Sequence, residues 1–232
     1  MKDHEKTTPD IQQSAIILDI KNRFRKTGFN GFSDEEMLIF ILSYASRDLG
    51  FILETSRNLI KKFANLRGVL DADMDEIASN EKTAGQTAAL LRLLKDASTE
   101  CLRQGVLGKN ARAGRKDLLN YLTLVLSGEK VEKFMAIYLG SRDEVIAIEL
   151  LHEGTINTTA VYPRKAIELC YRHGAKGIIF IHNHPSGDAT PSEVDRQLAK
   201  ALDAAAGSSG IKVHDHLIIG KKGHFSSMEM GF

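Results

Sequence analysis

The sequence predicts an α/β domain, with a mixed sheet and helices packed on it, preceded by a small all-α domain. In the first part of the chain apolar residues recur at helical spacing, and no strand-like alternation appears. Further along, short apolar runs rich in β-branched residues alternate with helical segments. A glycine-rich stretch separates the two patterns. We therefore predict a disordered tail at 1–12, an all-α domain at 13–105, a linker at 106–114 and the α/β domain at 115–232.

The composition is that of an ordinary globular protein. Of the 232 residues 43% are hydrophobic, the net charge is +1, and the two cysteines are isolated in the sequence. Because no apolar run approaches the length of about 20 residues that spans a bilayer, we expect no membrane segment. The polar N-terminus is unlike a signal peptide, so we expect a cytoplasmic location. The near-neutral charge gives no electrostatic argument for nucleic acid.

Capping signals place the helices of the N-terminal domain. Ser33 as N-cap and Glu36 three residues later form a capping-box pattern before an apolar run, which predicts a helix start. Further helices are expected at 52–63, 73–78 and 86–103.

The elements of the C-terminal domain follow from apolar runs and turn residues. A turn at Arg142 and Asp143 between two strand-like segments predicts an antiparallel hairpin. The elements expected in chain order are a helix at 117–126 capped by Asp117, strands at 131–139 and 144–151, a helix at 163–173, a strand at 177–181, a helix from 191 to about 206, and a strand at 212–219.

Two histidines follow the most apolar of these strands. Residues 177–181 are a continuous apolar run, typical of a strand buried on both faces. Side chains alternate along a strand, so His182 and His184 should point to the same side. Asn183 and Asp188 we interpret as turn-shaping residues.

The next helix should bring a hydroxyl and a carboxylate to the same place. Thr190 is the expected N-cap, Pro191 the first helical residue and Glu193 the partner in a capping box. On that helix Ser192 and Asp195 are three residues apart and share a face. Two imidazoles, a hydroxyl and a carboxylate can then converge on one point.

Two imidazoles and one carboxylate form a ligand set that suits zinc, with a fourth position left for water. Such a site lowers the pKa of water from about 15.7 to roughly 7, which is the chemistry of a hydrolase. The alternative is that both histidines are turn residues whose rings cap loop backbone.

The spacing His-x-His, seven residues, Ser, two residues, Asp resembles the JAMM motif of the JAB/MPN metalloprotease superfamily. The string 182–195, together with 215–220, resembles the RadC family within it, and the resemblance covers about 115–232. It implies a cytidine-deaminase-like sheet and a zinc-dependent hydrolase of the deubiquitinase type that acts on a protein or peptide. One zinc ion would be held by His182, His184 and Asp195, with Ser192 stabilising the tetrahedral intermediate.

The N-terminal domain resembles that of RadC proteins through residues 33–38 and 59–70. In that family a helix-hairpin-helix follows, whose glycines let backbone amides meet a DNA phosphate. Here the corresponding stretch, 78–86, lacks the paired glycines, so the motif is degenerate. Residues 1–110 contain 16 Lys or Arg and 16 Asp or Glu. We expect a protein-interaction or vestigial DNA-binding module.

Amide hydrolysis also needs a proton shuttle, and three glutamates qualify by position: Glu132, Glu149 and Glu153. In the JAMM pattern the acid/base lies at the start of an early strand, which favours Glu132. The alternative for Glu132 is a solvent-exposed edge residue. Ser192 has two interpretations, an oxyanion donor or a simple capping residue, and His216 is as consistent with a core position as with the pocket.

Three hypotheses follow. The first is a zinc hydrolase for peptide or isopeptide bonds. The second is a DNA-repair-associated or DNA-binding factor, which requires salt-dependent DNA binding. The third is an inactive scaffold of the same fold. A zinc deaminase is excluded because it would carry His-x-Glu and a downstream Pro-Cys-x-x-Cys.

Overall fold

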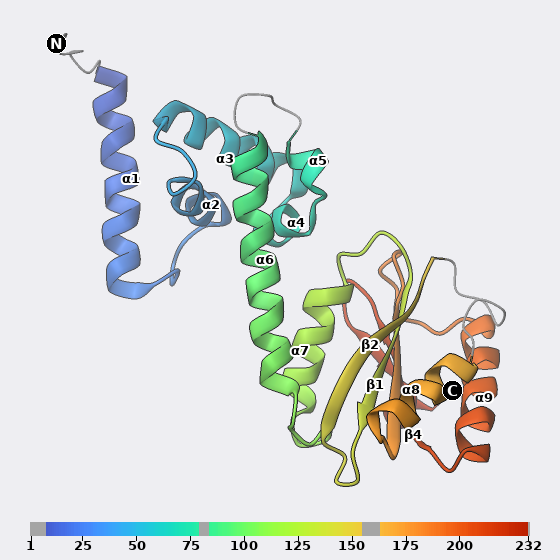
Figure 1. Ribbon diagram of the computed structural model, residues 1–232. Coiled ribbons are helices and arrows are strands. Elements are labelled where there is room, and N and C mark those ends of the chain that lie inside the picture. The colour runs from blue at the N-terminus through green and yellow to red at the C-terminus, as the bar shows by residue number, and fades with distance from the viewer. Residues whose placement is uncertain (1–7, 79–83, 155–162, 232) are drawn as a thin grey trace. The chain divides into compact units, whose positions relative to one another are not determined.

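A computed structural model describes residues 8–78, 84–154 and 163–231 (Figure 1). The chain divides into two compact units, Met1–Ala97 and Ser98–Phe232. Of the predicted tail, residues 1–7 lie outside the described residues and the remainder begins a helix. Residues 79–83 of the degenerate hairpin also lie outside them. No helix in the described parts of the chain has the length and apolar character needed to cross a membrane.

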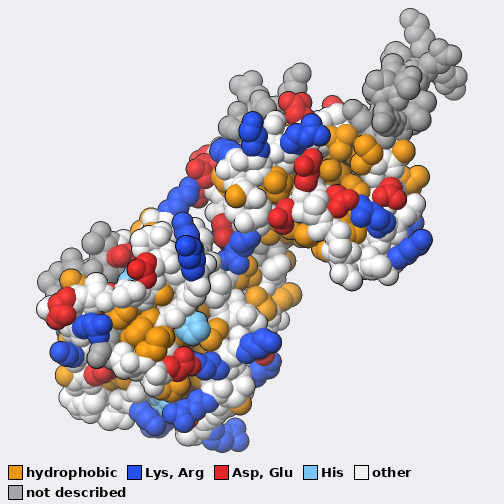
Figure 2. All heavy atoms as spheres, turned by 180° about the vertical axis from the view of Figure 1, so that it is seen from behind, with side chains coloured by type: hydrophobic (Ala, Val, Ile, Leu, Met, Phe, Trp, Pro, Cys, Tyr) orange, Lys and Arg blue, Asp and Glu red, His pale blue; other side chains and the backbone are white. Residues whose placement is uncertain are grey.

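The regular secondary structure described in unit 1 is all helical, as predicted. Its helices are α1 (Thr8–Thr27), α2 (Asp34–Leu42), α3 (Leu49–Phe63), α4 (Leu66–Asp71), α5 (Met74–Ile77) and the first part of α6 (Ala84–Val106), which continues into unit 2. The predicted capping box forms, because Ser33 accepts the Glu36 amide and the Glu36 carboxylate accepts the Ser33 amide. Apolar side chains from α1, α2, α3, α4 and α6 form the core. On the visible face of unit 1 acidic and basic side chains are interspersed (Figure 2).

The stretch predicted as a linker is hydrogen bonded to the sheet of unit 2. The Gly108 amide donates to the Val145 carbonyl at 2.8 Å, and the Val145 amide donates to the Lys109 carbonyl at 2.9 Å. Ala111 is buried in the core of this unit. The glycine content that suggested a linker instead permits a turn, since Gly108 has a φ of +75°.

Unit 2 contains the predicted mixed sheet. Its strands are β1 (Lys133–Leu139), β2 (Val145–Glu153), β3 (Gly177–Asn183), β4 (Lys212–Ile219) and β5 (His224–Ser226), in the order β2-β1-β3-β4-β5. β1 is antiparallel to β2 and β3, β3 is parallel to β4, and β4 is antiparallel to β5. Every residue of β3 is buried, as its apolar sequence predicts.

Helices cover both faces of this sheet (Figure 1). They are α7 (Arg115–Leu126), α8 (Pro163–His173), α9 (Glu193–Ser208) and the short α10 (Ser227–Met230). α7 packs on one face with Ile137 and Ile181 of the sheet, whereas α8 and α9 pack on the other with Ala136 and Phe180. The sheet is therefore the middle layer between two cores.

The predicted cap of α7 was wrong. The helix begins at Arg115 with Gly114 as N-cap, because the Gly114 carbonyl already accepts the Leu118 amide at 3.0 Å. The Asp117 carboxylate instead accepts a hydrogen bond from Lys109 Nζ at 3.2 Å.

Candidate metal centre

The end of β3 brings two imidazoles together. His182 belongs to β3, and His184 follows directly after it. The His184 amide donates to the Ile219 carbonyl of β4 at 3.0 Å, so the chain stays extended beyond the end of the strand. Both rings therefore lie on the same side, as the alternation predicts, and their Nε2 atoms are 3.2 Å apart.

The start of α9 brings the carboxylate. The helix begins at Glu193, and Ser192 is its N-cap with extended backbone angles. Its hydroxyl oxygen accepts the Asp195 amide at 3.2 Å, while Asp195 Oδ2 accepts the Ser192 amide at 2.7 Å. This capping box places Asp195 on the first turn of α9, facing the end of β3.

The predicted start of this helix, with Thr190 as cap and Pro191 as first residue, was wrong. Two capping-box patterns overlap here, Thr190 with Glu193 and Ser192 with Asp195. The amide and the hydroxyl of Thr190 both donate to Asp188 Oδ1, at 2.9 and 2.8 Å, and these bonds hold Thr190 in the preceding turn. Only the second pattern is left to start the helix.

The three side chains form a compact cluster. Asp195 Oδ1 lies 3.1 Å from His182 Nε2, and Oδ2 lies 3.3 Å from His184 Nε2. Burial alone would raise the pKa of Asp195, but hydrogen bonds from His182, His184 and Ser192 outweigh it and hold that pKa well below its usual range. The carboxylate is therefore ionised at neutral pH.

A backbone carbonyl fixes the tautomer of His184. Its Nδ1 lies 2.7 Å from the Asp188 carbonyl oxygen. Because a carbonyl only accepts, Nδ1 carries the hydrogen, and in the neutral ring Nε2 presents its lone pair to the cluster. In the protonated ring Nε2–H donates to Asp195, and this bond raises the pKa of His184, although burial opposes it.

This donor set fits a divalent metal ion. The ligand atoms of His182, His184 and Asp195 all lie within 4.8 Å of one another. The second nitrogen of a ligating histidine usually donates to a carbonyl or carboxylate, as His184 does here. Imidazole and carboxylate ligands suit several divalent ions, zinc among them.

Of the three candidate glutamates, Glu132 is two residues before Phe134, which pairs with His182 and stacks on its ring, so alternation puts Glu132 on the side of the sheet that carries the cluster. It directly precedes β1 and is half-buried. Its negative charge makes a small contribution, after those of Asp195 and the Asp188 carbonyl, to the raised pKa of His184. Glu149 contacts His173 Nε2 on α8 at 3.0 Å, and Glu153 lies at the exposed end of β2.

Ser192 and His216 have other contacts in the structure. The Ser192 hydroxyl donates to Asp195 Oδ2 at 2.6 Å, so it orients the carboxylate as well as capping α9. Its role toward an oxyanion stays a prediction. His216 Nε2 lies 2.9 Å from Asp203 Oδ1, and its ring stacks on Phe180 within the sheet layer. His216 is therefore part of the packing between β4 and α9.

Sequence reasoning missed the role of Asn183. It is not a turn residue: it ends β3, only 1% of it is exposed, and its side chain bonds to the backbone just before β1. The sequence did contain a signal: Asn183 follows an apolar run and lies between two candidate ligands. A side-chain amide buried there needs hydrogen-bond partners, which indicates a structural role.

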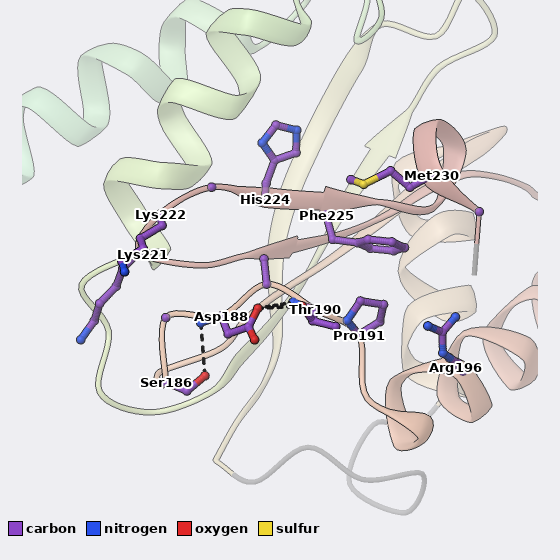
Figure 3. Close-up of a pocket in the computed structure, with 14 residues that line it drawn as sticks. Ser186, Asp188, Thr190, Pro191, Arg196, Lys221, Lys222, His224, Phe225 and Met230 are labelled. Atoms are coloured by element: carbon purple, nitrogen blue, oxygen red, sulfur yellow. Dashed lines mark hydrogen bonds between the residues drawn. The ribbon is translucent and has the colours of Figure 1, made fainter.

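A cavity of about 880 Å³ borders the loop between His184 and Ser192. It is lined by residues 186–191 of that loop, by Arg196 on α9, by the turn and strand 221–225, and by residues 230–231. In Figure 3 the rings of Phe225 and Pro191 face each other across it. Among the described residues, none of the three cluster side chains lines this cavity.

The turn after β4 is joined to the same loop. The Lys221 amide donates to the Gly187 carbonyl at 3.0 Å. A Cβ added at Gly220 would lie 2.5 Å from that carbonyl oxygen, so the two backbones touch. The loop that presents the Asp188 carbonyl to His184 therefore rests on the turn that follows β4.

A family model described as a RadC-like JAB domain matches residues 113–232. The match covers more than half of the chain and contains the sheet, α7 to α10 and the His182, His184 and Asp195 cluster. It agrees with the resemblance found in the sequence. The chain therefore belongs to the RadC family of JAB-domain proteins.

Proposed function

We propose that unit 2 is a zinc-dependent hydrolase that cleaves amide bonds in proteins or peptides, including isopeptide bonds. The observation that supports this proposal is the convergence of His182, His184 and Asp195, with the His184 tautomer set by the Asp188 carbonyl. Such a pre-arranged set of lone pairs is what a catalytic zinc site requires. Zinc in a site of this kind supplies a lowered pKa for water and polarisation of a carbonyl oxygen.

Glu132 is the proposed general acid/base. Its half-buried side chain lies on the same side of the sheet as Phe134 and His182, where it can take a proton from water and return it to the leaving amine. Ser192 holds Asp195 in place and is the candidate donor to the oxyanion, for which its hydroxyl would rotate away from Oδ2.

Metal content tests the first part of the proposal. The full chain, purified without a histidine tag, should hold about one zinc ion by elemental analysis, and His184→Ala should hold none. His216→Gln is the matched control. His216 contacts Asp203 instead of the cluster, so this substitution should leave the zinc content unchanged. Absence of zinc in the wild type, even after reconstitution, would refute the hydrolase.

Turnover tests the second part. Zinc-loaded protein should hydrolyse fluorogenic peptide or isopeptide probes, and Glu132→Gln should keep its zinc while losing about 10²- to 10⁴-fold in kcat. Zinc binding without turnover of any probe would instead favour the inactive scaffold. Salt-dependent binding of the full chain to DNA, with no turnover, would favour the DNA-linked function.

A further inference from the structure

Asn183 lies between the two histidines but belongs to a different set of contacts. Successive side chains of a strand point to opposite sides, so the Asn183 amide points away from the imidazoles of His182 and His184. Only 1% of this residue is exposed. A buried primary amide must find partners for its donors and its acceptor, and here it finds them on the neighbouring chain segment.

The partners are two backbone groups on either side of Glu132. Asn183 Nδ2 donates to the Val131 carbonyl at 3.1 Å, and Asn183 Oδ1 accepts the Lys133 amide at 2.7 Å. The orientation of the amide is fixed by chemistry, because a carbonyl can only accept and a backbone N–H can only donate.

These bonds hold both peptide planes that meet at the Glu132 Cα. The Val131 carbonyl belongs to the plane before it, and the Lys133 amide belongs to the plane after it. The Glu132 carbonyl, in that second plane, also accepts the Gly154 amide at 2.9 Å. Because φ and ψ of a residue are set by the two planes that flank it, the direction of the Glu132 Cα–Cβ bond is set as well.

The backbone pairing of β1 with β3 does not reach Glu132, although the bond from Gly154 links Glu132 to the end of β2. The pairing of β1 with β3 ends at Phe134 and His182, two residues past Glu132 along the chain. The Asn183 side chain continues the connection between the two segments where the backbone pairing stops. Without it, the segment before Lys133 keeps the bond from Gly154 but loses these two side-chain bonds to β3.

We infer that Asn183 is a positioning residue, whose side-chain amide fixes the backbone around Glu132 and so aims its carboxylate at the His182, His184 and Asp195 cluster. The inference rests on the proposed function for the role of Glu132, whereas the backbone attachment can be tested without any activity.

Hydrogen exchange tests the attachment. In Asn183→Ala the Lys133 amide should exchange at least about tenfold faster than in the wild type, because its acceptor is gone. Asn110→Ala is the matched control in the same unit: Asn110 also donates to a carbonyl, that of Arg142, and accepts two backbone amides. It should leave Lys133 unchanged. Unchanged protection of Lys133 in Asn183→Ala would overturn the inference.

Kinetics and metal content test whether Asn183 orients the Glu132 carboxylate. Asn183→Ala should keep its zinc and its KM while kcat falls about 10- to 100-fold. The double variant Glu132→Gln with Asn183→Ala should be no slower than Glu132→Gln alone, since both changes remove the same function. Loss of zinc in Asn183→Ala would show a general structural role and overturn the inference. So would a fall in kcat from Glu132→Gln to the double variant as large as the fall from wild type to Asn183→Ala.

Two further measurements cover the remaining outcomes. If Asn183→Ala does not fold, Asn183→Asp keeps the acceptor for Lys133 and breaks only the bond to Val131, and kcat should still fall with zinc retained. If the wild type binds metal but turns over no probe, the proposed function fails. The cobalt-loaded protein then tests whether Asn183 orients the Glu132 carboxylate. The pH midpoint of its visible spectrum should shift equally in Glu132→Gln and Asn183→Ala. A shift in Glu132→Gln alone would refute the inference about Asn183.

Discussion

Gly220 sits where the turn after β4 meets the loop that carries the Asp188 carbonyl, and its replacement by alanine should weaken metal binding. The added Cβ would lie 2.5 Å from the Gly187 carbonyl oxygen and 3.1 Å from the Ala189 amide nitrogen. Since Cβ contacts under 3.0 Å essentially never occur, the two backbones must separate by at least about half an ångström. Both neighbours are backbone atoms, so no side chain can rotate to make room.

That separation moves the segment that holds His184. The Asp188 carbonyl, between the two displaced residues, contacts His184 Nδ1 at 2.7 Å, and this contact orients the ring. Loss of such a partner of a metal ligand typically costs 10- to 100-fold in affinity, and overpacking costs about 1–3 kcal/mol in stability. We expect Gly220→Ala to show both effects in a zinc competition titration with a chelator and in thermal unfolding.

Gly207→Ala supplies the control. Gly207 lies on α9, the helix of Asp195, and a Cβ there meets nothing within 4 Å. This change should leave zinc affinity unaltered and raise stability by about 0.5–1 kcal/mol. Wild-type zinc affinity in Gly220→Ala would refute the coupling between the turn and the loop, even if stability fell.

Two further predictions concern the fold around β4. Asp215→Ala should lower the free energy of unfolding by about 1–3 kcal/mol in chemical denaturation, because the buried Ser226 hydroxyl loses its acceptor while Arg115 keeps its contact with Glu229. Asp203→Ala, at an exposed carboxylate, should cost less than about 1 kcal/mol. Burial lowers the pKa of His214 below its ordinary value of 6.5. Stability therefore falls as the pH drops from about 6.5 toward the lower folded pKa, because the unfolded chain binds the proton first, and it levels off below the folded pKa. His214→Gln should lose less stability than the wild type between about pH 7.5 and 5.5 in urea titrations, and an equal loss would refute this assignment.

The sequence was sufficient for the features that depend on local pattern. The strand before His182, the shared side of His182 and His184, and the mixed sheet follow from alternation and apolar runs, because burial of β3 on both faces requires such a run. The Ser33 and Glu36 capping box was likewise predictable, since both partners lie within four residues.

The features that were missed depend on contacts between distant segments or on competition between equivalent local patterns. Asn183 contacts residues about 50 positions earlier in the chain, and nothing local to it indicates that partner. The start of α9 was misplaced because Thr190 and Ser192 are both good caps, and only the Asp188 carboxylate, bound to Thr190, decides between them. The stretch 106–114 resembled a linker because its sequence does not show that its backbone bonds to Asp143 and Val145, more than 30 residues later in the chain.

The three cluster residues all lie within residues 182–195, a single strand, loop and helix start, and this compactness bears on how the protein takes up metal during synthesis. Ligands so close in sequence remain close in the unfolded chain, because the entropy needed to close a loop grows with its length. On the proposed site, the nascent segment should therefore capture zinc before β4 has been made. A ligand that also binds the unfolded state stabilises the native state less than its affinity for the native protein suggests. We expect zinc to raise the melting temperature by less than its measured Kd implies, and to affect the order of folding more than the final stability.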